Sequence, residues 1–269
     1  MHEKDNNTEA PSKGNLFSRL FLILGALLVV SALAIACFVI WQYVDAQNRN
    51  HQIQSASGFD FSFLQTVGND TKLEDMRFDW DALRAINPDV VGWIIVPDTN
   101  INYPIVQGAD NEHYLRHLFD SSYSGAGAIF VDYAGSPTLD GKNNIIYGHN
   151  MFDGTMFSDI HLYTNQDFFD GHRVVYLCTP ARNFELSAIA CINVSAGAPL
   201  RQFDFGSSSD FASFVSETLA APVSVAPDLS TKIVETESLY MFITCETFDF
   251  SKRDVLCCVP IRSAVPNSR

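Results

Sequence analysis

The feature that most constrains this chain is an uncharged apolar block near its N-terminus. Leu20 to Trp41 are 22 consecutive residues without a charged side chain. As an α-helix rising about 1.5 Å per residue, this block is roughly 33 Å long, which is enough to cross a bilayer. The sequence therefore predicts a transmembrane anchor over residues 20–43, preceded by a short N-terminus of residues 1–19.

The flanks of this block favour an uncleaved anchor with a defined orientation. The apolar region of a cleavable signal peptide spans only about 7 to 15 residues and ends at a small-residue cleavage site. Lys13 and Arg19 precede the block, and only Arg49 follows it closely. By the positive-inside rule, we expect a single-pass cell-membrane protein with residues 1–19 in the cytoplasm and the rest of the chain outside the cell.

The charge of the chain excludes two classes of partner. The formal net charge is -14, and residues 1–19 are neutral because their acidic and basic side chains balance. All of the excess negative charge therefore belongs to the exported part. Such a surface argues against nucleic acid or anionic lipid as a partner.

Two segments precede the main domain. Residues 44–74 are polar at first and then mixed, which predicts a stalk. From residue 75 the apolar side chains recur at helical spacing as far as Ile86, where Asn87-Pro88 ends the pattern. We therefore expect a helix at the start of a single domain that covers residues 75–269.

The rest of this domain has the pattern of a mainly β protein. Eight short runs rich in Val, Ile and aromatic residues are bounded by Gly, Pro, Asn and Asp, which predicts a β-barrel or sandwich. The runs are VVGWIIV, INYPIVQ, GAIFVDY, NNIIYGH, RVVYLC, FELSAIACINV, LYMFITC and DVLCCVPI. Between Ser195 and Leu239 the segment SSSDFASFVSETL has apolar residues at helical spacing, so we expect a helix inside that connection.

The cysteines raise the question of which thiol is reactive. Six are present, and Cys37 lies in the apolar block, which leaves five in the exported part. An odd number in an exported domain requires a free thiol or an intermolecular bridge. No C-x-x-C spacing occurs, which argues against a zinc site. We expect the adjacent pair Cys257-Cys258 to fill the core.

Three residues with chemically useful side chains stand at strand ends: His149, Cys245 and Arg253. A thiol near an imidazole can ionise to the nucleophilic thiolate, and a guanidinium can stabilise the oxyanion formed when a peptide carbonyl is attacked. Taken singly, each residue has a structural explanation. Cys245 also suits a buried apolar position, His149 a turn cap and Arg253 a solvated charge.

Four motifs connect these residues to a known family. They are N-P-D-V-V-G-W-I-I-V-P at 87–97, N-I-N-Y-P-I-V-Q at 100–107, I-I-Y-G-H-N-M at 145–151, and Thr244-Cys245 followed by Arg253. Together they resemble the sortase family, most closely its class B members. The resemblance covers about residues 78–261, which is nearly the whole exported part.

The resemblance implies a fold and an activity. The fold is an eight-stranded closed β-barrel with an N-terminal helix and a helix inserted before the nucleophile strand. The activity is that of a membrane-anchored cysteine transpeptidase, without metal or organic cofactor. Cys245 would attack the Thr carbonyl of a C-terminal sorting signal of a secreted protein, His149 would act as acid and base, and Arg253 would position the signal and stabilise the oxyanion.

The resemblance also implies partners and leaves alternatives open. The acceptor would be an amine of a peptidoglycan cross-bridge or of its lipid-linked precursor. The family often has T-L-x-T-C before the nucleophile, whereas this chain has M-F-I-T-C, so only Thr244 and Cys245 match and Thr244 is the candidate substrate-binding residue. The alternatives are a pilin polymerase that uses a lysine amine, and a catalytically silent surface interaction module. In the leading interpretation His161 and His172 are replaceable.

Overall fold

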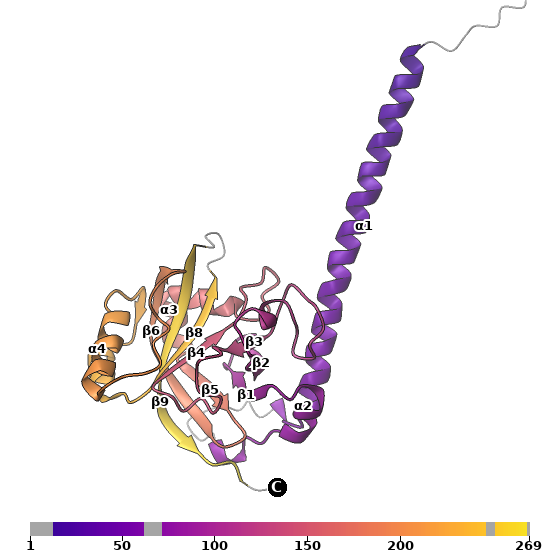
Figure 1. The fold of residues 1–269 in the computed structure, drawn as a ribbon. Helices are drawn as coiled ribbons and strands as arrows, with labels where there is room; N and C mark the ends of the chain where they lie inside the picture. The colour runs from indigo at the N-terminus through magenta and orange to yellow at the C-terminus, as the bar shows by residue number, and fades with distance from the viewer. Residues whose placement is uncertain (1–12, 62–71, 246–250, 268–269) are drawn as a thin grey trace, which may run out of the picture. The chain divides into compact units, whose positions relative to one another are not determined.

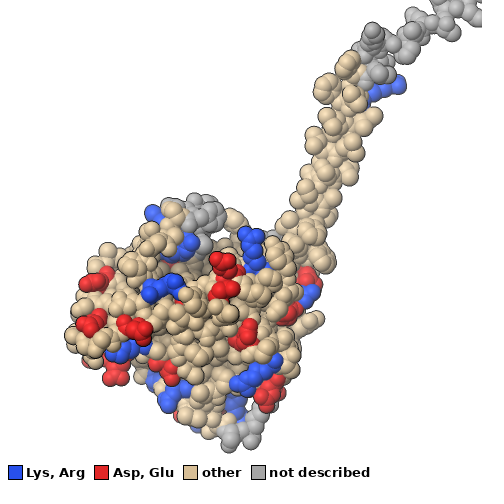
Figure 2. Space-filling model, in the orientation of Figure 1, with Lys and Arg blue, Asp and Glu red and all other residues tan. Residues whose placement is uncertain are grey.

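The apolar block forms part of one long helix in the computed structural model, α1 (Lys13–Ala56). Within Phe17–Ala56, a window of 18 residues reaches a mean hydropathy of 2.9. No part of that 18-residue window is buried inside the protein. On the face seen in Figure 2, most of this helix presents uncharged side chains. By length and composition, the helix is able to cross a membrane, as an anchor or as a signal sequence.

The structure describes residues 13–61, 72–245 and 251–267, and it divides into two units after Asn48. The second unit begins at Arg49, inside α1, so the last turns of this helix belong to the folded domain. The predicted N-terminus of residues 1–19 therefore lies mostly outside the described residues. So do residues 62–71 of the predicted stalk.

The part of the predicted stalk that follows residue 48 contacts the barrel. Ile53 is 4% exposed and belongs to the same buried cluster as Trp93 of the barrel. The side-chain amide of Gln54 donates a hydrogen bond to the backbone carbonyl of Asn102 over 3.1 Å. This end of the segment packs against the barrel because moving the apolar side chain of Ile53 out of water lowers the free energy of the folded protein.

All eight predicted strands form, and they close a barrel (Figure 1). The order is β5-β1-β2-β3-β4-β8-β9-β6, and pairing of β5 with β6 closes the ring. The strands are β1 (Val90–Ile95), β2 (Asn102–Val106), β3 (Ile129–Val131), β4 (Asn143–Tyr147), β5 (Val174–Cys178), β6 (Asn183–Ser195), β8 (Leu239–Cys245) and β9 (Lys252–Ala264). The two-residue strand β7 (Ser224–Val225) pairs with β6 outside this ring. The predicted eight-stranded closed barrel is confirmed.

Short helices connect these strands. The helix expected over residues 75–86 begins only at Trp80, because the Asp79 carboxylate caps its N-terminus by accepting from the amide of Ala82 (3.0 Å). The elements are the 3-10 helices η2 (Leu73–Asp75), η3 (His113–Leu115) and η4 (Ser158–Thr164), and the α-helices α2 (Trp80–Ile86), α3 (Gln166–Gly171), α4 (Ser208–Thr218) and α5 (Leu229–Glu235).

Helix α4 confirms the helix expected before the nucleophile strand. It starts at Ser208 because the hydroxyl of Ser207 accepts from the amide of Asp210, over 3.2 Å. Its apolar face, with Phe211 and Val215, is buried in a cluster with side chains of β8 and β9. The inserted connection is therefore fixed to the strands that carry Cys245 and Arg253.

Candidate active site

Three neighbouring strands bring the predicted catalytic residues to one edge of the barrel. Strands β4 and β8 run parallel, with Tyr147 in register with Ile243. His149 lies two residues after Tyr147, and Cys245 lies two residues after Ile243. Both residues therefore lie at the same edge of the sheet. Strands β8 and β9 are antiparallel, and Cys245 stands directly opposite Arg253. The backbone thus places together three residues that are far apart in the sequence.

A cavity of about 250 Å³ lies at this edge. His149, Thr244 and Arg253 all line it. The other lining residues come from β3, β4, β8, η3 and nearby loops: Asn111, Leu115, Phe130, Tyr147, Gly148, Ala196 and Ile243. The side chain of Cys245 lies outside the described part of the structure, but its backbone ends β8 immediately after two of these lining residues.

The end of β4 requires glycine before His149. A Cβ atom on Gly148 would lie 2.5 Å from Cδ1 of Ile129 and 2.6 Å from the ring of Phe157. The amide of Gly148 donates to the carbonyl of Ile243 over 3.1 Å, so the strand pairing continues through this residue. The tight packing explains the Y-G-H motif, because it fixes the backbone from which His149 projects.

His149 and Arg253 each have a described hydrogen bond at the cavity. The Nε2 atom of His149 lies 2.8 Å from the backbone carbonyl oxygen of Leu115, the last residue of η3. Arg253 donates from Nη1 to the carbonyl of Lys252 over 2.8 Å. Both residues line the cavity.

Thr244, the predicted substrate-binding residue, is buried beside the cavity. Its exposed fraction is 2%, and its hydroxyl oxygen has no hydrogen-bond partner among the described residues. Its side chain is therefore not offered to solvent, although the residue itself lines the cavity.

The remaining thiols of the unit that begins at Arg49 are enclosed in the core. Cys178, Cys191, Cys257 and Cys258 have no exposed surface. Burial raises the pKa of each of them, to about 12 for Cys191. A buried neutral thiol is a poor nucleophile. The expectation that the Cys257-Cys258 pair fills the core is confirmed.

Sequence reasoning missed a buried carboxylate behind the cavity wall. Asp132 accepts hydrogen bonds from Arg201 (Nε 2.5 Å, Nη2 2.9 Å), from the side-chain amide of Asn111 (2.9 Å) and from the hydroxyl of Tyr147 (2.9 Å). Its side chain has no exposed surface. Asn111 and Tyr147 line the cavity, and Arg201 belongs to the inserted connection, so Asp132 joins the insertion to the cavity wall.

Burial and hydrogen bonding shift the pKa of both Asp132 and Tyr147. Burial alone would raise the pKa of Asp132, but hydrogen bonds from Arg201 and its other donors outweigh it and hold the pKa below its ordinary value. Burial, and then the charge of Asp132, raises the pKa of Tyr147 well above the usual range. No local motif marks this network, because its members come from four separate segments.

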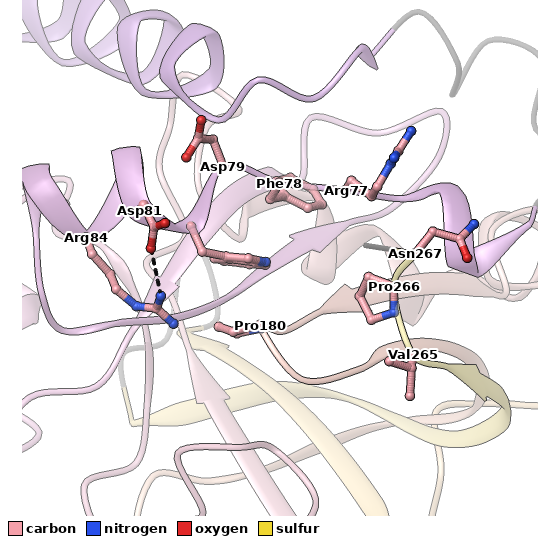
Figure 3. Close-up of a pocket in the computed structure, with 10 residues that line it drawn as sticks. Arg77, Phe78, Asp79, Asp81, Arg84, Pro180, Val265, Pro266 and Asn267 are labelled. Carbon is pink, nitrogen blue, oxygen red and sulfur yellow. Dashed lines mark hydrogen bonds and ion pairs between the residues drawn. The ribbon is translucent and has the colours of Figure 1, made fainter. Parts of the chain in front are cut away.

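A second cavity, of about 490 Å³, has a different lining. It is formed by α2, the residues just before it, Pro180 and the segment after β9 (Figure 3). Asp81 and Arg84 form an ion pair at its side over 3.3 Å. None of its lining residues is a cysteine or histidine, so we place the chemistry at the smaller cavity. Within the described ranges, no cluster of His, Cys, Asp and Glu has the makeup of a metal site.

Known proteins with the same features are class B sortases. The family model for the sortase domain matches residues 94–260. Sortase B of Listeria monocytogenes is 31% identical over 173 residues, which are 64% of this chain and 69% of that protein. Sortase B of Staphylococcus aureus is 27% identical over 197 residues, or 71% of this chain and 79% of that protein.

The solved structures agree with the sequence matches. The X-ray structure of Clostridium perfringens sortase B superimposes with a TM-score of 0.63 at 28% identity. That match covers 68% of this chain and 100% of the other. The matched family domain contains His149, Thr244, Cys245 and Arg253, so the residues gathered at the barrel edge all lie within it.

Proposed function

Because this chain belongs to the sortase family, as a cysteine transpeptidase of class B, we propose that it anchors secreted proteins to the cell wall. Its substrate in this proposal is a C-terminal sorting signal, and its acceptor is an amine of the peptidoglycan cross-bridge or of the lipid-linked precursor. The observation that carries the proposal is the backbone placement of Cys245 opposite Arg253 and beside the strand that leads to His149.

The first half of the proposed reaction forms a thioester. The thiolate of Cys245 attacks the carbonyl carbon of the threonine in the sorting signal, which gives a tetrahedral oxyanion. His149 donates a proton to the leaving amine, the peptide C–N bond breaks, and the acyl group stays on sulfur. In the second half, the acceptor amine attacks the thioester, His149 takes its proton, and the Cys245 thiolate is released with the new amide bond formed.

Arg253 and the cavity wall have supporting roles in this proposal. The guanidinium of Arg253 presents a planar set of donors to the oxyanion and to the backbone of the signal. Thr244 contributes to the wall on which the signal lies, although little of this residue is exposed. Tyr147 and Asn111, fixed by Asp132, form another part of the wall.

The proposal also covers how the protein is held in the membrane and which amine accepts the acyl group. Residues 20–43 of α1 would hold the protein in the membrane, with residues 1–19 in the cytoplasm and the catalytic cavity outside. The negative charge of the exported part agrees with a peptide amine as partner better than with an anionic polymer. A cell-wall amine is favoured over a pilin lysine, because class B sortases are generally not pilin polymerases.

The test uses the full-length protein in detergent micelles. It is incubated with a small library of sorting peptides, and mass spectrometry locates the acyl group. The expected result is a thioester on Cys245 that is absent from Cys245→Ala and is resolved by a cross-bridge peptide amine. A thioester on another thiol, or turnover by Cys245→Ala, would overturn the assignment, and resolution only by a pilin lysine peptide would favour the polymerase.

A further inference from the structure

We propose that His161 is a positioning residue for the thioester-forming step and acts through Asp254 on the strand ends that carry Cys245 and Arg253. The inference rests on the proposed function and deepens it. From the sequence, His161 is expected to be replaceable. The structure places it in contact with the residue that follows Arg253 on β9.

Asp254 is a buried carboxylate with both oxygens engaged. It has no exposed surface. Its Oδ2 atom lies 2.7 Å from Nδ1 of His161, and its Oδ1 atom accepts from the side-chain amide of Asn193 over 2.6 Å. Because an ionised carboxylate only accepts, Nδ1 of His161 donates in this contact. The carboxylate thus ties together η4, which carries His161, and β6, which carries Asn193.

The strand register places this carboxylate directly behind the candidate active site. Asp254 stands opposite Thr244 on β8 and opposite Asn193 on β6. The next pair on β8 and β9 is Cys245 with Arg253. Since side chains alternate along a strand, Asp254 points to the opposite face of the sheet from Arg253. Its contacts therefore fix the backbone at the catalytic pair without entering the cavity.

Removing the His161 donor would disturb this arrangement. A charged group without water is tolerated only with its hydrogen-bond partners in place. Without His161, Asp254 would have to rotate towards another donor or admit water between η4 and β9. Either change moves the backbone of β9 next to Arg253. A displacement of about 1 Å in a catalytic group can cost about 100-fold in rate.

His161 is a positioning residue rather than a second catalytic base. It does not line the cavity that contains His149 and Arg253. Its described hydrogen bond is to Asp254, on the other face of the sheet. A half-exposed side chain on η4, with 36% exposure, can be replaced without leaving a cavity in the core. Variants at this position are therefore expected to fold.

His172 provides a matched control. It is also a partly buried histidine, and its Nδ1 atom lies 2.8 Å from a backbone carbonyl, that of Phe168. Its ring stacks on the ring of Phe168 at 3.9 Å. Both contacts stay within α3 and its C-cap, so its loss removes a histidine hydrogen bond without touching β8 or β9.

The experiment compares His161→Leu, His161→Asn, Asp254→Asn and His172→Leu in the full-length protein. For each variant, the rate of thioester formation is measured against peptide concentration, together with the melting temperature. We expect His161→Leu and Asp254→Asn to lower the maximal rate about 10- to 100-fold with KM within about threefold. His161→Asn, which keeps an N–H donor, is expected to recover most of the rate, and His172→Leu to react within about twofold of wild type.

A second readout separates failure of this inference from failure of the proposed function. The rate at which a small alkylating reagent modifies Cys245 needs no sorting signal, and it is expected to change in His161→Leu but not in His172→Leu. If wild type forms no thioester, the proposed function fails, and alkylation alone decides the role of His161. Wild-type rates in His161→Leu by both measurements, or no recovery in a folded His161→Asn, would overturn the inference.

Discussion

The Nε2 atom of His149 lies 2.8 Å from the carbonyl oxygen of Leu115, and this contact determines which ring nitrogen carries the proton when the imidazole is neutral. A carbonyl oxygen only accepts hydrogen bonds, so Nε2 carries a proton in this arrangement. In the neutral ring, Nδ1 is then the basic atom. The loop that contains η3 therefore fixes the imidazole tautomer as well as its orientation.

This contact makes a prediction about the neutral imidazole. In protein labelled with ¹⁵N-histidine, the ring of His149 is expected to show the pattern of a protonated Nε2 and an unprotonated Nδ1 once it is neutral. Two-dimensional NMR of the ring nitrogens, with His149→Gln to assign the signal, makes the measurement. A neutral ring protonated on Nδ1 would mean that the Leu115 contact is not kept in solution.

Thiol labelling tests the burial of the other cysteines. A cationic thiol reagent, which does not enter a detergent micelle, is expected to modify one cysteine of the folded protein, Cys245. The other four thiols of the folded domain, those of Cys178, Cys191, Cys257 and Cys258, are fully buried and have a raised pKa. Mass spectrometry counts the adducts, and the same reaction in denaturant should modify all of them. Rapid native modification of Cys257 or Cys258 would contradict the structure.

Replacement of Arg253 by lysine separates geometry from charge. Lysine keeps the positive charge but loses the planar set of donors. We expect Arg253→Lys to lose thioester formation almost as fully as Arg253→Ala, by about 100-fold or more, as for loss of an oxyanion donor. Arg84→Lys, at an exposed ion pair on α2, is the control and should react normally. Full activity of Arg253→Lys would reduce Arg253 to an electrostatic role.

The buried Asp132 predicts a pH dependence of stability. Its pKa is lowered in the folded protein, so its contribution is present above the unfolded pKa and is lost as the pH falls through the folded pKa. Asp132→Asn is expected to be about 1 to 3 kcal/mol less stable at pH 7. This difference should shrink below about pH 4.

Denaturant unfolding at several pH values measures this difference. Asp81→Asn, at an exposed ion pair, is the control and should change stability little at any pH. If the gap between Asp132→Asn and wild type were the same at pH 3 and pH 7, the charge of Asp132 would not be the source of its effect.

Gly148 is expected to tolerate no side chain. A Cβ atom there would overlap Ile129 and Phe157, and overpacking of this kind costs about 1 to 3 kcal/mol. Gly148→Ala should lower the melting temperature and slow thioester formation, because relief of the overlap displaces the backbone before His149. Gly197→Ala, where nothing lies within 4 Å of the added atom, is the control. Unchanged melting and activity in Gly148→Ala would show that the strand end adapts.

Local signals in the sequence were sufficient for the eight barrel strands and for α4. The alternation and turn residues around each apolar run predicted all eight barrel strands, and the spacing of Phe211 and Val215 predicted α4. These signals are local because a strand or helix buries one face at a fixed period. The burial of Ile53 within the predicted stalk could not be read from local signals, since it depends on a partner, Trp93, that is forty residues away.

The residues of the candidate site also fall into two groups, those that local motifs reveal and those that depend on distant partners. His149, Cys245 and Arg253 could be selected because family motifs surround them. Asp132 and the pair His161 and Asp254 could not, because their partners come from segments with no common pattern.

The eight barrel strands, helix α4 and the residues with reactive side chains could be identified from the order of amino acids, because each depends on near neighbours along the chain. Which carboxylates are buried behind the cavity, and which donors satisfy them, became clear only from the folded chain. The physical reason is that strand register and barrel closure set those distances, and a buried charge is defined by neighbours in space rather than in sequence.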